Sequence, residues 1–144
     1  MQDWMLLLYK IPRNPSKVRV YVWRKLKRIG AVLLHESVWC LPSNPKTKEQ
    51  FQWLTVEIQE LGGEATLWES QLVLGMKDEL IVKEFLEQVE QEYAEILDEL
   101  KKEEFDLVSL SKKYQQIKLK DYFQSDLGKH VLEELQKARG GIKG

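Results

Sequence analysis

The chain has 144 residues, a net charge of −1 and one cysteine, Cys40. This length suits one domain, or one domain with an extension, and a single cysteine excludes an internal disulfide. Hydrophobic residues make up 43% and charged residues 31% of the chain, which is typical of a folded chain and excludes a disordered one. The apolar start at residues 4–9 is too short to cross a membrane and lacks the flanks of a signal peptide. We therefore expect a cytoplasmic protein without membrane contact.

The first 76 residues predict an α+β domain. Apolar runs, helical periodicities and the breaks at Pro12, Gly30 and Gly62 place its elements. Ser16 is expected to cap the first helix. In chain order, the elements are a strand at 4–11, a helix at 17–29, strands at 31–34 and 38–41, a helix at 47–61 and a strand at 65–74. The order β-α-β-β-α-β predicts a ferredoxin-like antiparallel sheet with both helices on one face.

A helical extension is expected from residue 77 to residue 144, packed on the first domain. Its helices are predicted at 77–103, 107–118 and 124–137, and residues 140–144 are expected to fray. The apolar seam of the first of these helices consists of Leu80, Ile81, Phe85, Val89, Tyr93, Ile96, Leu97 and Leu100.

Charge is unevenly distributed along the chain. Residues 10–28 contain eight basic side chains and no acid, whereas residues 77–104 contain eleven acids and four lysines. The helix at 17–29 places Lys17, Arg24 and Arg28 on its outer face, because their spacing returns them to one side. A basic surface of this kind attracts anions or a nucleic-acid backbone. The candidate binding residues are Arg13, Lys17, Arg19, Trp23, Arg24, Lys27 and Arg28.

Arg19 and Trp23 are four residues apart and are expected to lie beside the apolar stripe, with the guanidinium stacked on the indole. Replacing Arg19 is therefore expected to cost stability. The alternative for the whole basic surface is that it is only solvated, or is paired with the acidic helix at 77–103.

The sequence offers no recognisable catalytic centre. His35, Cys40 and His130 are too few and too dispersed for a metal site, and neighbours in the turn at 35–37 splay apart instead of forming a catalytic group. We therefore predict no enzyme activity, no cofactor and no bound catalytic metal.

Several motifs resemble the N-terminal domain of ChrB-type chromate resistance proteins. They include the Arg19-x-x-x-Trp23-Arg24 helix followed by Gly30-Ala31, and a hairpin that ends in Leu41-Pro42. Further matches are Phe51-x-Trp53-Leu54-x-x-Glu57, Gly62-Gly63-Glu64-Ala65, Lys113-Tyr114 and Asp121-Tyr122-Phe123. The first 74 residues are also similar to ferredoxin-like domains of PaaX-type repressors and of the small CRISPR adaptation nuclease. That nuclease carries a metal-binding aspartate at the end of its first strand, where this chain has Tyr9-Lys10-Ile11-Pro12.

The ChrB resemblance implies a role in chromate resistance, since longer ChrB proteins are chromate-responsive regulators with a second domain. We expect a free-standing copy of the N-terminal domain that acts as a non-enzymatic regulator or accessory protein. Its basic helix would act on DNA, on an oxyanion such as chromate or sulfate, or on a partner protein. The alternative is a protein-interaction module that dimerises through its sheet edge or its acidic helix. A degenerate nuclease relative is a third alternative. A homodimer is expected at micromolar concentration.

Overall fold

The computed structural model describes residues 2–13 and 15–143, and the surroundings of side chains as far as residue 141. Within it the chain forms two compact units, residues 1–81 and 82–144. The third helix, α3 (Asp78–Leu100), begins in the first unit and continues in the second.

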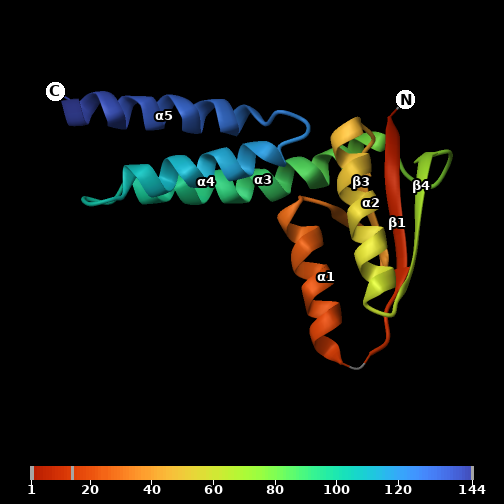
Figure 1. Cartoon of the computed structure of the whole chain (residues 1–144). Coiled ribbons are helices and arrows are strands. Elements are labelled where there is room, and N and C mark those ends of the chain that lie inside the picture. Colours follow the sequence, from red (N-terminus) through yellow and green to blue (C-terminus); the bar gives the residue numbers. More distant parts are fainter. Residues whose placement is uncertain (1, 14, 144) are drawn as a thin grey trace. The chain divides into compact units, whose positions relative to one another are not determined.

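The first unit has the predicted order of elements (Figure 1). The α+β class is therefore confirmed, and the bounds of the elements differ from the prediction by a few residues. The elements are β1 (Asp3–Lys10), α1 (Ser16–Arg28), β2 (Val32–His35), β3 (Val38–Pro42), α2 (Pro45–Glu60) and β4 (Glu64–Gln71). The largest difference is the last strand, which ends three residues before the predicted Leu74.

The strands of the described residues form one sheet in the order β2-β3-β1-β4, and every neighbouring pair is antiparallel. Because β3 lies between β1 and β2 and is antiparallel to both, β1 and β2 are parallel to each other. For the same reason β3 and β4, on either side of β1, are parallel to each other. Each β-α-β segment is therefore split by a strand of the other. Leu7 on β1 lies opposite Trp39 on β3 and Leu67 on β4, and α1 and α2 cover this face (Figure 1).

The core of the first unit lies between this sheet face and the two helices. Leu7, Leu26, Phe51 and Ile58 are fully buried, which stabilises the unit by roughly 1.5–3 kcal/mol for each side chain. On α1, Val22 is also fully buried, so Val22 and Leu26 form the side of this helix that faces the core.

The two helices of this unit begin differently. Asn44 caps α2, because its side chain accepts from the Thr47 backbone N–H while the Thr47 hydroxyl accepts from the Asn44 N–H. The prediction that Ser16 caps α1 is wrong: Ser16 is its first residue, and Pro15 occupies the cap position without a side-chain hydrogen bond. Both helices end as predicted, since Gly30 and Gly62 follow them with φ values of 81° and 91°.

The start of α3 is attached to β1 within the first unit. The Asp78 carboxylate accepts from the Trp4 indole N–H at 3.0 Å and from the Gln2 backbone N–H at 3.1 Å. These two hydrogen bonds lower the pKa of Asp78. Leu80 was expected in the apolar seam of this helix, but it is 55% exposed. It lies about 100° around the helix from Ile81, whose side of α3 is the buried one together with Phe85.

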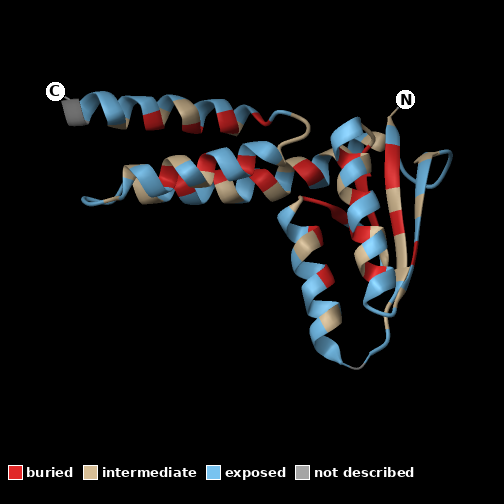
Figure 2. Ribbon diagram, viewed as in Figure 1, coloured by how far each residue is buried: buried red, intermediate tan, exposed pale blue. Residues whose placement is uncertain are grey.

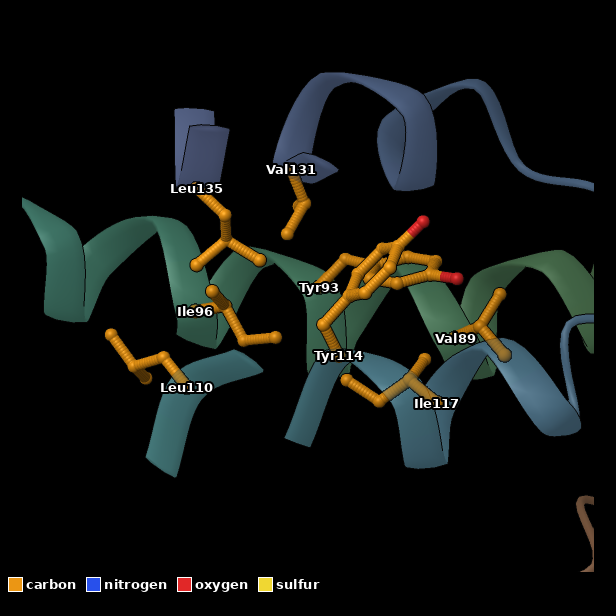
Figure 3. Packing of buried hydrophobic residues seen from close by; sticks show 8 residues of the cluster. All are labelled: Val89, Tyr93, Ile96, Leu110, Tyr114, Ile117, Val131 and Leu135. Atoms are coloured by element: carbon orange, nitrogen blue, oxygen red, sulfur yellow. The ribbon is translucent and has the colours of Figure 1, made fainter. Parts of the chain in front are cut away.

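The second unit contains the rest of α3 with α4 (Leu107–Leu119) and α5 (Asp126–Lys143). Figure 3 shows its core, where Tyr93 of α3, Tyr114 of α4 and Val131 of α5 meet among the other buried residues. The prediction of a frayed end is wrong for residues 140–143, which continue α5, and Gly144 lies outside the described residues. Without a proline, two glycines lower helix propensity but do not end the helix.

Candidate anion-binding surface

The outer side of α1 is the most basic surface of the first unit. Its thirteen residues include no acid, and Lys25, Lys27 and Arg28 lie in its last turn, where cations interact favourably with the helix dipole. Figure 2 shows that most of α1 is exposed, with buried residues on one side only. Because the apolar residues occupy the side of α1 that faces the core, the charged side chains lie on the side that faces solvent, as expected from the helical period.

All seven predicted binding residues are exposed, six on α1 and Arg13 in the loop before it. Six basic side chains of this segment have no ion-pair partner among the residues that the structure describes: Lys10, Arg13, Lys17, Arg19, Arg24 and Arg28. Whether the seven residues bind a ligand stays a prediction.

The expected stack of the Arg19 guanidinium on the Trp23 indole is wrong. Trp23 is 50% exposed, and the cation over its ring is the Lys27 ammonium, 5.9 Å from the ring centroid. Arg19 is exposed as well. One helical turn separates Trp23 from both candidates, but only the C-terminal neighbour reaches over the ring.

A contact between the two helices was missed by the sequence. The Lys25 ammonium lies 2.8 Å from the Glu57 carboxylate of α2, and the Tyr21 hydroxyl donates to the same carboxylate. The hydrogen bond from Lys25, together with that from Tyr21, lowers the pKa of Glu57, and the bond to Glu57 raises the pKa of Lys25. One acid that pairs with the basic helix is therefore on α2. In the sequence, the one signal that singled out Glu57 was its place in the motif Phe51-x-Trp53-Leu54-x-x-Glu57.

Two grooves flank α1, and Val20 and Arg24 lie on the ridge between them because both residues line both grooves. The first groove, about 730 Å³, runs between α1 and α2 and is mostly apolar. The second, about 630 Å³, lies between α1 and the β2–β3 hairpin. Both volumes are within the range of small-molecule sites.

The candidate metal ligands remain apart. Cys40 is fully buried on β3, whereas His35 is exposed at the end of β2 and is paired with Val38. Among the residues described, no group of three or more histidine, cysteine or carboxylate side chains could hold a metal ion.

The structure shows no candidate membrane span. Among the described residues, no helix is both long enough and apolar enough to cross a membrane.

Fold and surface together define an α+β domain with an exposed basic helix, followed by a helical unit. The family model of the N-terminal region of protein ChrB matches residues 19–102, more than half of the chain. The protein belongs to this family. It is also similar to protein ChrB of Cupriavidus metallidurans, with 32% identity over 54 residues. That match covers 38% of this chain and 17% of the relative, less than a fifth of its length. No solved structure matches the chain.

Proposed function

We propose that this protein is a non-enzymatic regulatory or accessory protein of chromate resistance that binds a nucleic-acid backbone through α1. The link to chromate follows from membership of the ChrB family. The observation that carries the binding proposal is the set of exposed, unpaired basic side chains on and beside a helix without acids. Such a surface has a positive potential even though the whole chain is slightly acidic.

The spread of the charges favours a polyanion over a single oxyanion. Thirteen helical residues extend about 20 Å at 1.5 Å per residue, so Arg13 and Arg28 lie at opposite ends of the surface. One chromate or sulfate ion can contact only a few of these side chains, whereas successive phosphates of a DNA strand can contact many of them. Contacts of this kind position a protein on DNA without reading its sequence.

The experiment compares two double variants in binding to a short DNA duplex at low salt. Replacing Arg24 and Arg28 together with alanine removes two exposed, unpaired cations of α1. Replacing Lys112 and Lys129 with alanine removes two exposed cations of the second unit and serves as the matched control. If each arginine contacts one phosphate, the slope of log K against log salt concentration falls in magnitude by about 2.

We expect the arginine double variant to bind at least tenfold more weakly, with an unchanged melting temperature. Binding equal to that of the wild type, or an equal loss in the lysine control, would contradict the proposal. An affinity for chromate or sulfate that depends on the same two arginines, without DNA binding, would favour the oxyanion alternative.

A second candidate function is self-association. Between β4 and the first turn of α3, Val73 and Leu74 are 92% and 90% exposed, and Met76 and Leu80 are about half exposed. Exposed apolar side chains in one segment are typical of an interaction surface. We propose a homodimer at micromolar concentration. Sedimentation should show twice the mass of one chain, and Leu74→Ser should weaken the dimer whereas Val108→Ser, an equivalent change on α4, should not.

Two finer assignments belong to the same proposal. The interleaved β-α-β halves of the first unit, with β1 and β3 central, support a ferredoxin-like fold. A cytoplasmic location is supported by the presence of a single cysteine, Cys40, which cannot form an internal disulfide, because proteins of oxidising compartments more often carry disulfides.

A further inference from the structure

The groove between α1 and the β2–β3 hairpin has a lining unlike that of a purely electrostatic surface. It combines three cations, Lys10, Arg19 and Arg24, with three aromatic rings. None of the cations has an ion-pair partner among the residues described. The groove therefore offers uncompensated positive charge next to flat apolar walls.

The start of α1 adds to the positive character of this groove. Ser16, the first residue of the helix, lines it. The helix has no side-chain cap and no acid in its first turn, so the positive end of its dipole is not compensated locally. Glu36, in the hairpin turn, is the acid among the lining residues, and its carboxylate can accept hydrogen bonds from hydroxyl groups.

The aromatic residues of the groove are Tyr9, Trp23 and Trp39. Trp39 is 2% exposed, and its indole Nε1–H is buried without a hydrogen-bond partner in the structure. A buried donor without a partner is rare, and it costs free energy until an acceptor reaches it. Because Trp39 also lines the groove, a ligand there would contact this side chain.

The size of the groove argues against a lone tetrahedral oxyanion, which would fill a small part of about 630 Å³. A ligand that uses the whole lining needs an anionic group for the arginines and a planar ring for the aromatic walls. Nucleotides combine both, since bases stack on aromatic side chains and phosphates bind arginine forks.

We propose that this groove binds a free nucleoside monophosphate. The phosphate lies at Arg19 and Arg24, the base lies against the aromatic rings, and Glu36 accepts from the ribose hydroxyls. The inference goes beyond the proposed function, because it places a small ligand in a groove and not a polymer along the outer surface. Loss of duplex binding in the Arg24/Arg28 variant would therefore not decide it.

The test measures binding of AMP to the full chain by calorimetry and by the indole N–H signals of ¹⁵N-labelled protein. Single Trp→Phe variants assign the signals of the five tryptophans. Arg19→Gln removes a groove cation, and Arg139→Gln removes an exposed arginine of the second unit as the matched control. Both residues are exposed, so neither change should unfold the protein.

We expect saturable AMP binding that shifts the Trp39 signal, weakens about tenfold or more in Arg19→Gln and is unchanged in Arg139→Gln. Adenosine and inorganic phosphate should each bind more weakly than AMP. No saturable binding at millimolar AMP, equal binding of phosphate or adenosine, or an equal effect of the two arginine variants would overturn the proposal. Binding of a single-stranded oligonucleotide without binding of AMP would overturn it too.

Discussion

The ammonium of Lys25 and the carboxylate of Glu57 lie 2.8 Å apart and connect α1 to α2. The Tyr21 hydroxyl donates to the same carboxylate. Glu57 thus compensates one cation of the basic helix. Lys17, Arg19, Arg24 and Arg28 of α1 have no ion-pair partner among the residues described. Tyr21 and Glu57 also line the groove between the two helices.

Glu57→Gln should destabilise the protein slightly and strengthen its binding to polyanions. The pair is partly exposed, with Lys25 at 36% and Glu57 at 28%, so we expect the free energy of unfolding to fall by about 1 kcal/mol or less. One more uncompensated cation on α1 should increase the affinity for duplex DNA. Glu60→Gln is the control, because Glu60 lines the same groove without an ion pair among the residues described. Chemical denaturation that ranks the two variants equally would contradict this role of Glu57.

The same pair predicts a pH dependence on the acid side. The hydrogen bond from Lys25 holds the folded pKa of Glu57 below its ordinary value of 4.5, so its contribution to stability is complete above about pH 4.5. That contribution is lost as the pH falls through the folded pKa. Between neutral pH and pH 3, wild-type protein should lose more stability than Glu57→Gln. Parallel pH profiles of the two proteins would refute the assignment.

Arg19→Ala should leave stability almost unchanged, contrary to the expectation from sequence. Arg19 is exposed and is not stacked on Trp23, and changes at such surface positions cost about 0.5 kcal/mol or less. Leu26→Ala, on the buried side of the same helix, should cost about 2–5 kcal/mol. Urea unfolding of both variants measures the contrast. A loss above 1 kcal/mol for Arg19→Ala would mean that its side chain holds the helix in place.

Gly128→Ala and Gly140→Ala should change the stability of the second unit in opposite directions. A Cβ at Gly128 would lie 2.9 Å from the ring and the hydroxyl of Tyr93, whereas one at Gly140 would meet nothing within 4 Å. Overpacking costs about 1–3 kcal/mol, more than alanine gains in helix propensity. At Gly140 the gain of up to about 1 kcal/mol has no opposing contact. Thermal unfolding that shows stabilisation by both changes would contradict the close packing of Tyr93 on Gly128.

Tyr93→Phe should destabilise the second unit by about 1 kcal/mol. The Tyr93 hydroxyl donates to Asp121 at 2.9 Å, and the same carboxylate accepts from the Ser125 backbone N–H at 3.0 Å. The hydroxyl therefore supports the residue just before α5. Removing it leaves Asp121 with one partner fewer, and hydrogen exchange at the start of α5 should become faster. Unchanged exchange there would show that the contact contributes little.

The second unit should also lose stability at high pH. Burial and the bond to Asp121 raise the pKa of Tyr93, and burial raises the pKa of Tyr122 to about 12. Both rings are neutral in the folded state, so their contribution is complete below about pH 10 and is lost as the pH rises through the folded pKa values. Tyr93→Phe should reduce this loss without abolishing it, because Tyr122 remains. Unfolding curves between pH 9 and 12 would measure the difference.

The sequence by itself determined the order of the elements, because the signals for them are local. The apolar stripe of Val22 and Leu26 defines a helix and its buried side, and Gly30 and Gly62 end their helices through a backbone conformation that other residues rarely adopt. The exposure of the α1 cations follows from the same helical period. The helical periods and helix ends depend on residues that are a few positions apart, so they can be read directly from the sequence.

Only the tertiary structure decided which partners these residues meet. Lys25 and Glu57 are 32 positions apart, and whether their side chains meet depends on how α1 and α2 pack on the sheet. The sequence also could not show that the indole N–H of Trp39 is buried without a hydrogen-bond partner, because this depends on how the strand packs against α1. Sequence spacing could not predict whether Arg19 or Lys27 lies over the Trp23 ring, because both residues are one helical turn from Trp23. Local periodicity fixes the direction in which a side chain points, but its contacts depend on distances set by the packing of the whole unit.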